Sequence, residues 1–284
     1  MSELAAFRYV KGHGTANDFV VLPDPDADLD ITSELVRALC DRRTGLGADG
    51  VLRVVRTDCM PGHIADDPEA RWFMDYRNAD GSMAEMCGNG IRVFARYLVD
   101  GGFATPGRLR IATRDGVKTV DADVEGDVTV DMGVARSLGV DGCSVELDGM
   151  ARPGVAVSIG NPHVVVAVDD PAAIGDLGAL RVRPDGAFPD GVNVEFVTRV
   201  GERHFQSRVH ERGVGETHSC GTGACAVVAA LGDSSDPATY AVDLPGGRLS
   251  VTRCEDGHLL LRGAAVLVAQ GVIRDEWLAA AERA

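Results

Sequence analysis

Two cysteines in matching contexts could carry out acid–base chemistry. Cys87 precedes Gly88-Asn89-Gly90, and Cys220 precedes Gly221-Thr222-Gly223, so the turn Cys-Gly-x-Gly occurs twice. An apolar segment with helical character follows each turn, which predicts a thiol at each of two helix N-termini. Free N–H groups and the helix dipole favour anions there. We therefore expect each thiol to ionise more easily than usual and a carboxylate to bind beside it.

The two turns belong to a longer internal repetition. The segment 156–166 resembles 14–21, the segment 189–194 resembles 48–51, and Glu211 precedes Cys220 by the same spacing as Asn78 precedes Cys87. This order indicates a duplicated module. We predict an α+β fold of two pseudo-symmetric lobes, each a barrel-like mixed or antiparallel sheet wrapped around a central apolar helix. The predicted lobes are residues 1–132, with 272–284 docking back on them, and residues 133–271.

Composition limits the classes of partner. The 284 residues carry 28 basic and 43 acidic side chains, a formal net charge of −15, which argues against binding to nucleic acid or an anionic membrane. No apolar stretch approaches the roughly 18 residues of a membrane span, and no signal-peptide layout is present. Seven cysteines without framework or zinc-type spacing predict a soluble, reduced, cytoplasmic protein.

If the lobes face each other, the two thiols would flank one carbon atom. One thiolate could remove a proton from one face while the other thiol delivers a proton to the opposite face, which is the chemistry of a racemase or epimerase. An amino-acid α-hydrogen is a weak acid, and each pK unit of mismatch costs about 1.36 kcal/mol. Preorganised N–H donors, each contributing about 3 kcal/mol, could stabilise the charge on a substrate carboxylate. The donors expected to do so are near Gly88, Asn89, Gly221 and Thr222.

A cofactor is not expected. Pyridoxal phosphate requires a Schiff-base lysine, and the only lysines, Lys11 and Lys118, lie in no recognisable pocket motif. The histidines are too scattered for a metal site. The Gly45–Gly50 segment has the form GxGxxG, but it follows a predicted helix and precedes a strand, so it indicates a tight turn instead of a nucleotide site.

The motifs in combination resemble the diaminopimelate epimerase family through nearly the whole chain. This resemblance implies interconversion of LL- and meso-diaminopimelate for lysine and cell-wall synthesis, without cofactor or metal, by a homodimer. It implies that Cys87 and Cys220 are the acid/base pair, that Arg212 binds the distal carboxylate and that Glu211 binds the distal ammonium. The other implied substrate contacts are Asn17, Asn78, Asn161 and Asn193, with His163 near the thiols. Gly50 departs from the family pattern, since many members carry glutamine there.

Two alternatives remain open. A proline racemase or hydroxyproline epimerase would carry histidine where Asn89 stands and would not need Glu211 and Arg212. A non-catalytic redox sensor would join Cys87 to Cys220 in a regulatory disulfide. Several further residues are expected to be structural: Cys40, Cys143, Cys225 and Cys254 as filler, Cys59 as a loop thiol, and Arg92 and Arg96 as a solvated helix face.

Overall fold

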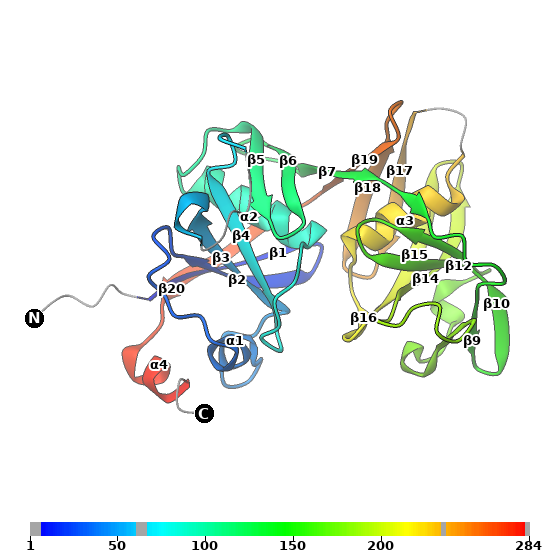
Figure 1. The fold of residues 1–284 in the computed structure, drawn as a ribbon, viewed down its shortest axis with the longest axis horizontal. Coiled ribbons are helices and arrows are strands. Elements are labelled where there is room, and N and C mark those ends of the chain that lie inside the picture. Colours follow the sequence, from blue (N-terminus) through cyan, green and yellow to red (C-terminus); the bar gives the residue numbers. More distant parts are fainter. Residues whose placement is uncertain (1–6, 61–66, 234–236, 282–284) are drawn as a thin grey trace, which may run out of the picture. The chain divides into compact units, whose positions relative to one another are not determined.

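The computed structural model describes residues 7–60, 67–233 and 237–281, which form two compact units (Figure 1). Unit 1 comprises the chain up to Val130 together with the chain from Ala264 onward, and unit 2 comprises Asp131–Gly263. Unit 2 ends at Gly263, whereas the sequence analysis placed the end of the second lobe at residue 271. The reason is that the strand at Val266–Val272 pairs with the first strand of unit 1, a long-range contact that local sequence patterns do not reveal.

The sheet of unit 1 has the spatial order β20-β1-β2-β3-β4-β5-β6-β7. The pairs β2–β3 and β4–β5 are parallel, and the other neighbours are antiparallel. Helix α2 contacts β1, β2, β3, β4, β6 and β20, so the sheet wraps around it. The strands are β1 (Arg8–Gly14), β2 (Asn17–Pro23), β3 (Gly50–Arg56), β4 (Trp72–Asn78), β5 (Gly107–Thr113), β6 (Gly116–Ala122), β7 (Val128–Val134) and β20 (Val266–Val272), and the helices are α1 (Ser33–Cys40), α2 (Gly88–Asp100), α4 (Asp275–Ala281) and the 3-10 turn η1 (Thr57–Cys59).

The sheet of unit 2 repeats this arrangement in the order β8-β11-β12-β14-β15-β17-β18-β19. Here β12–β14 and β15–β17 are the parallel pairs, so parallel and antiparallel neighbours follow one another as in unit 1. The shared pattern supports the duplication inferred from the sequence. The strands are β8 (Arg136–Ser137), β11 (Val155–Ser158), β12 (Pro162–Ala167), β14 (Asn193–Gly201), β15 (His204–Glu211), β16 (Gly215–Thr217), β17 (Ala238–Leu244), β18 (Gly247–Arg253) and β19 (His258–Gly263).

Smaller elements complete unit 2. Strand β16 pairs with β15, and three short strands form a separate sheet. Helix α3 contacts β11, β12, β14, β15, β18 and β19, and therefore occupies the place that α2 has in unit 1. The α+β fold with a central helix in each unit is thus confirmed. The remaining elements are β9 (Ser144–Leu147), β10 (Met150–Pro153), β13 (Arg181–Arg183), α3 (Gly221–Leu231) and the 3-10 turns η2 (Pro171–Ala173) and η3 (Leu177–Ala179).

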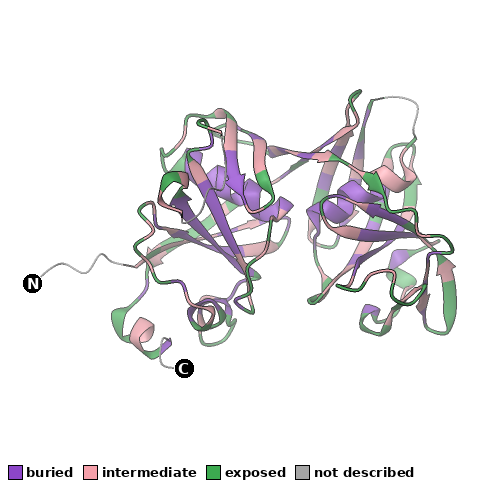
Figure 2. Cartoon of the chain, viewed as in Figure 1, coloured by how far each residue is buried: buried purple, intermediate pink, exposed green. Residues whose placement is uncertain are grey.

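Both central helices are buried (Figure 2). The expectation that Arg92 and Arg96 form a solvated face of α2 was wrong, because their side chains are 0% and 7% exposed. The Arg92 guanidinium donates to the Gly88 carbonyl at 3.0 Å and to the Thr15 hydroxyl at 3.2 Å. Arg96 donates to backbone carbonyls of the turn after β6. These two buried arginines therefore stabilise the interior through hydrogen bonds to the backbone and to Thr15.

In the described residues no helix is long and apolar enough to cross a membrane.

Helix α1 begins after Thr32, whose hydroxyl accepts the Leu35 N–H at 3.1 Å. The GxGxxG segment is confirmed as the connection from α1 to β3. Its first glycine, Gly45, approaches the helix end so closely that a Cβ atom would lie 2.0 Å from the Ala38 carbonyl oxygen. Helix α4 packs on α1, and the Trp277 indole donates to the Thr44 carbonyl at 3.1 Å.

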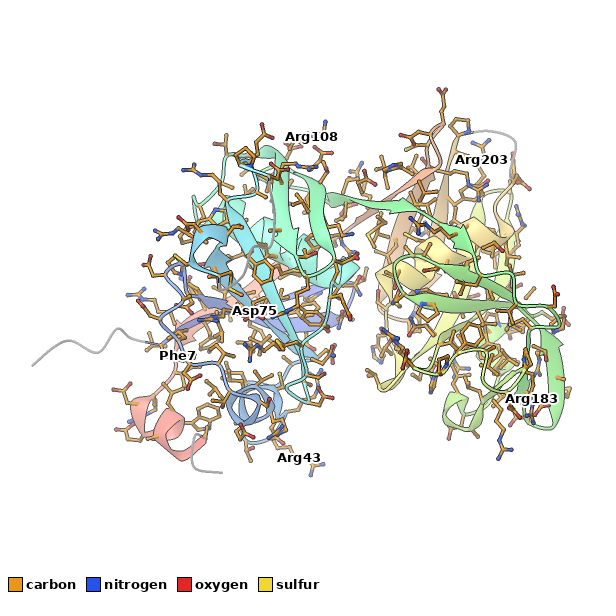
Figure 3. The ribbon with its side chains drawn as sticks, viewed as in Figure 1. Phe7, Arg43, Asp75, Arg108, Arg183 and Arg203 are labelled. Atoms are coloured by element: carbon orange, nitrogen blue, oxygen red, sulfur yellow. The ribbon has the colours of Figure 1, made fainter. Side chains whose placement is uncertain are left out.

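A buried carboxylate anchors the segment that leads into the first thiol turn. Asp75 in β4, labelled in Figure 3, is fully buried and forms an ion pair with Arg114. Arg114 also donates to the Tyr76 carbonyl at 3.0 Å and to the Ala84 carbonyl at 3.2 Å. Because Ala84 lies three residues before Cys87, this arginine ties the approach to α2 to strand β4.

Candidate active site

Cys87 is the N-cap of α2, and its sulfur accepts the Gly90 N–H at 3.4 Å. Asn17, the first residue of β2, lies against it, with the amide oxygen 3.7 Å from the sulfur. The same oxygen accepts a hydrogen bond from the Asn89 side chain at 3.2 Å. Three residues singled out in the sequence, Asn17, Cys87 and Asn89, therefore meet at the start of the central helix, beside the Gly88 backbone.

The orientation of Asn17 is set by Asp49, a residue that sequence reasoning passed over inside the GxGxxG turn. The Asp49 carboxylate accepts the Asn17 side-chain N–H at 2.8 Å and the Asp18 backbone N–H at 3.1 Å. Arg42 bridges Asp49 and Asp18, at 2.7 Å from each. Since the nitrogen of the amide points to Asp49, its oxygen must point toward Cys87.

Asp49→Ala is expected to slow proton transfer at Cys87 about 10- to 100-fold, because a hydrogen bond to a charged group contributes about 1.5–3 kcal/mol and Asn17 loses its fixed direction. Steady-state kinetics measures the effect, with thermal unfolding as the check on folding. The matched control is Asp58→Ala, which removes an exposed carboxylate from the same unit. Equal rates in the two variants would show that Asp49 does not position Asn17.

Asn78 stands at the end of β4, opposite Gly50 in the β3–β4 pairing. Its amide oxygen accepts the Tyr76 hydroxyl at 2.8 Å, and its amide nitrogen donates to Ser82 at 3.0 Å. A Cβ atom at Gly50 would lie 2.6 Å from the Arg77 carbonyl oxygen and 2.8 Å from the Tyr76 ring. The tyrosine thus fills the space where a longer side chain would start, which is a physical reason for glycine at this position.

Cys220 repeats the arrangement of Cys87 at the start of α3. Its sulfur accepts the Gly223 N–H at 3.4 Å and lies 3.3 Å from the Thr222 hydroxyl, beside the Gly221 backbone. Asn161 donates to the Thr222 hydroxyl at 3.4 Å, and its amide oxygen lies 2.9 Å from His163 Nε2. The structure therefore brings Asn161, His163 and Thr222 into one cluster with the second thiol.

A second group of predicted contacts gathers where β14 and β15 meet. The Asn193 amide oxygen accepts the Arg212 backbone N–H at 2.9 Å, and the Thr217 hydroxyl donates to Glu211. Arg212 lines a groove of about 350 Å³. Within the described part of the chain no carboxylate forms an ion pair with its guanidinium. The Arg212 side chain is thus available for an anionic ligand.

The expectation of easy ionisation was wrong for Cys220. Burial raises the pKa of the Cys220 thiol well above its usual range, and the charges of Glu211 and Glu195 act in the same direction. Hydrogen bonds from Thr222 and the Gly223 N–H lower the pKa but do not offset these effects. Burial also raises the pKa of the Glu211 carboxyl. Desolvation outweighs the helix dipole at this thiol and favours its protonated form.

Glu211→Gln is expected to move the pH profile for iodoacetamide alkylation of Cys220 to lower pH. A negative charge beside a thiol raises its pKa, so removing that charge favours the reactive thiolate. Peptide mass spectrometry of the Cys220 peptide measures the midpoint, with Glu202→Gln as the exposed control. A midpoint that stays in place, or moves to higher pH, would contradict this assignment of the charge effect.

Both lysines are engaged in ion pairs. Lys11 pairs with Asp18 at 2.6 Å, and Lys118 pairs with Asp115 at 2.6 Å. In residues 7–60, 67–233 and 237–281, no group of three or more histidine, cysteine or acidic side chains is arranged to hold a metal ion.

Comparison with solved structures defines the class of fold. The phenazine biosynthesis protein of the PhzF family from Bacillus anthracis superposes with a TM-score of 0.64, covering 95% of this chain and 100% of that one at 16% identity. A probable proline racemase from Agrobacterium radiobacter K84 superposes with a TM-score of 0.68, covering 95% and 93% at 13% identity. At these identities the likeness establishes the shared fold, which is that of the PhzF and proline racemase proteins.

Sequence comparison then gives the family. The family model described as diaminopimelate epimerase matches residues 9–138 and 155–268. The chain is 53% identical over 279 residues to the diaminopimelate epimerase of Streptomyces coelicolor, covering 95% of this chain and 96% of that protein. It is 48% identical over 271 residues to that of Thermobifida fusca, covering 94% and 98%. The chain belongs to the diaminopimelate epimerase family, as its motifs indicated.

Proposed function

We propose that this protein interconverts LL- and meso-diaminopimelate by an acid/base mechanism that uses Cys87 and Cys220. The observation that carries the proposal is the duplicated thiol turn, in which each sulfur caps a buried central helix of a chain that belongs to the diaminopimelate epimerase family. Asn17 lies beside the Cys87 sulfur, and Asn161 is linked to the Cys220 sulfur through Thr222. A redox sensor would need neither the paired amides nor the helix N-termini. All seven cysteines are free thiols.

In the proposed reaction one sulfur, as thiolate, takes the α-hydrogen of the substrate and becomes a thiol. The electron pair of the broken C–H bond moves toward the α-carboxylate, where backbone N–H groups near Gly88, Asn89, Gly221 and Thr222 stabilise the charge. The other thiol then donates its proton to the opposite face of the carbon. Proton count and charge balance, because one thiol is formed as the other is consumed, and the roles exchange in the reverse direction.

The distal end of diaminopimelate carries an ammonium and a carboxylate. Arg212 offers a guanidinium that can bind the carboxylate in bidentate fashion, and Glu211 offers a carboxylate for the ammonium. We assign Asn193 to the same end because its amide oxygen accepts the Arg212 N–H. We assign Asn161 to this end as well because it contacts His163, which also lies against Asn193. Asn17 and Asn78 are proposed contacts from unit 1.

Incubation with LL-diaminopimelate in deuterated water, with a metal chelator and no added cofactor, tests the proposal. The expected result is formation of the meso isomer with deuterium at the inverted α-carbon. Free proline serves as the comparison substrate and should show no α-hydrogen exchange. Exchange of proline without reaction of diaminopimelate would favour the proline racemase alternative, and a requirement for pyridoxal phosphate would contradict the cofactor-free mechanism.

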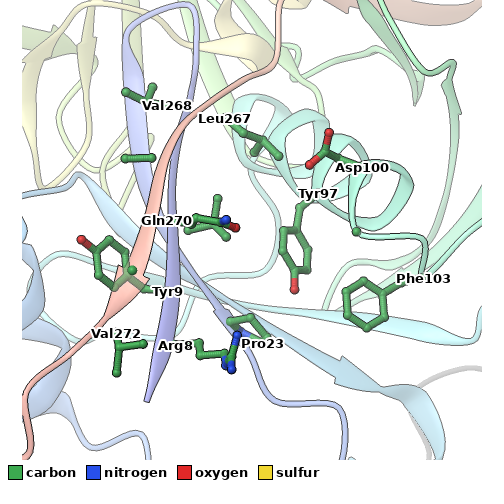
Figure 4. Close-up of a pocket in the computed structure, with 14 residues that line it drawn as sticks. Arg8, Tyr9, Pro23, Tyr97, Asp100, Phe103, Leu267, Val268, Gln270 and Val272 are labelled. Carbon is green, nitrogen blue, oxygen red and sulfur yellow. The ribbon is translucent and has the colours of Figure 1, made fainter. Parts of the chain in front are cut away.

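We also propose that the protein is a homodimer that works in the reducing cytoplasm, where its thiols stay free. Strand β20 exposes Val266, Val268 and Val272, and the last two line a groove of about 710 Å³ together with Tyr97 and Phe103 (Figure 4). Exposed valines on a strand are typical of a surface that another chain covers.

Val268→Asp is expected to convert the dimer to a monomer, because a charge would be buried at the centre of this surface. Sedimentation velocity measures the state, and Val200→Asp, at an exposed valine of unit 2, is the control that should leave the dimer intact. A monomeric wild-type protein, or a dimeric Val268→Asp variant, would contradict this assignment of the dimer surface.

A further inference from the structure

Glu195 is a buried carboxylate that sequence reasoning did not single out. It lies in β14, two residues after Asn193, and its side chain is 1% exposed. One carboxylate oxygen is 2.7 Å from His163 Nδ1. Among the described residues the other oxygen has no hydrogen-bond partner. A buried ionisable group with so few partners is costly, so its presence calls for a physical reason.

The duplication shows that the fold does not require a charge at this position. In unit 1 the parallel β2–β3 pair starts with Phe19 opposite Gly50, and in unit 2 the parallel β12–β14 pair starts with His163 opposite Asn193. Two residues further along β3 and β14, Leu52 therefore corresponds to Glu195. This register is two residues away from the match of segment 48–51 with 189–194 that the sequence indicated. Unit 1 builds the same sheet with Leu52, which is fully buried.

The contacts at the starts of α2 and α3 confirm that Leu52 and Glu195 occupy equivalent positions in their units. A Cβ atom at Gly90 would meet the Leu52 side chain at 3.2 Å, and a Cβ atom at Gly223 would meet the Glu195 carboxylate at 2.7 Å. Each glycine is the third residue after its thiol. Apolar side chains, Phe19 and Leu52, thus pack against the helix start that carries Cys87. The corresponding side chains at the helix start that carries Cys220 are the ionisable residues His163 and Glu195.

A continuous chain of polar contacts links Glu195 to the second thiol. It runs from Glu195 to His163 Nδ1 at 2.7 Å, from His163 Nε2 to the Asn161 oxygen at 2.9 Å, from the Asn161 nitrogen to the Thr222 hydroxyl at 3.4 Å, and from that hydroxyl to the Cys220 sulfur at 3.3 Å. His163 Nδ1 faces the Glu195 carboxylate and Nε2 faces the Asn161 oxygen, with the Asn193 amide nitrogen 3.5 Å from Nε2. The carboxylate thus holds the ring by one nitrogen and directs the other toward Asn161.

We propose that Glu195 is a positioning residue: it holds the His163 ring by Nδ1 and so fixes the direction of the hydrogen-bond chain that ends at Cys220. The proposal rests on the proposed epimerase function for its kinetic consequence only. With the carboxylate in place, the Asn161 oxygen is held by the ring and its nitrogen faces Thr222. A neutral partner at position 195 holds the His163 ring less firmly, and the Asn161 amide can then turn over.

Glu195→Gln keeps the shape of the side chain and removes its charge. Because the carboxylate acts through His163, the Glu195→Gln substitution is expected to lower kcat/KM about 10- to 100-fold in the wild-type background. In a His163→Gln background the same substitution should lower kcat/KM less than about threefold. Glu202→Gln, at an exposed glutamate, is the control and should leave kcat/KM unchanged in both backgrounds. An equal loss in both backgrounds, or no loss in the wild-type background, would overturn the proposal.

Nitrogen-15 NMR of the histidine side chains gives a readout that does not depend on turnover. In the wild-type protein the Nδ1 resonance of His163 is expected to show a proton hydrogen-bonded to a carboxylate, and Glu195→Gln is expected to shift that resonance. A wild-type ring without a proton on Nδ1, or the same spectrum in both proteins, would overturn the proposal. If the wild-type protein did not epimerise diaminopimelate, the proposed function would fail while this spectrum would still decide the role of Glu195.

Discussion

Replacing either Cys87 or Cys220 with alanine is expected to lower the rate of diaminopimelate epimerisation by at least about 10³-fold. A positioned acid or base contributes about 10² to 10⁴ to a rate, and inversion needs both groups in every turnover. The measurement is the initial rate in both directions, LL to meso and meso to LL. Each single variant should fail in both directions, and the double variant should be no worse than either, since the two thiols act as one unit.

Cys254→Ala is the matched control, because this thiol is part-exposed like Cys87 and lies in unit 2 outside the cluster around Cys220. It should retain the wild-type rate. Substantial activity in the Cys87→Ala, Cys220→Ala double variant would refute the two-thiol mechanism. Loss of activity on oxidation, with recovery on reduction, is expected in either case and does not distinguish a catalyst from a redox sensor.

Arg212→Met is expected to raise the KM for diaminopimelate about 100-fold, with a smaller change in kcat. Truncating one partner of a hydrogen-bonded charge pair costs about 2–5 kcal/mol, and the distal carboxylate has no other guanidinium assigned to it. Arg212→Lys keeps the charge but loses the bidentate geometry, so its KM should lie between those of wild type and Arg212→Met. Steady-state kinetics with both stereoisomers measures the series.

Arg203→Met provides the control, since Arg203 is exposed in the same unit and is labelled in Figure 3. It should leave KM unchanged. If Arg212→Met reacted with diaminopimelate as well as the wild-type protein, the assignment of the distal carboxylate would be wrong. The result also bears on substrate class, because a proline-type isomerase acts on a substrate with one carboxylate and would not need this arginine.

Local sequence patterns were sufficient to predict the duplication, the two thiol turns and the asparagines near them. Each of these depends on residues close in sequence or on a repeat that is visible directly, and helix starts obey strong local rules. The N-cap positions of Cys87 and Cys220 follow from the same rules. The family resemblance added the function, and the comparisons confirmed the family.

What the sequence did not reveal depends on long-range packing. Arg92 carries a charge, which normally predicts exposure, but its carbonyl and hydroxyl partners come from the helix start and from Thr15 in the β1–β2 turn. Glu195 sits in an apolar strand, a signal that could have been used, yet its partner His163 comes from another strand. The ionisation of Cys220 is governed by burial, which no local pattern reports.

The central claim is that the two thiols act on opposite faces of one carbon, and isotope exchange in single-cysteine variants tests it most directly. In Cys87→Ser the remaining thiol can still remove the α-hydrogen that faces it and return deuterium from deuterated water to the same face. It should therefore label one stereoisomer of diaminopimelate without inverting it. Cys220→Ser should label the other stereoisomer. If both variants labelled the same isomer, or if either labelled both, the two-face mechanism would be contradicted.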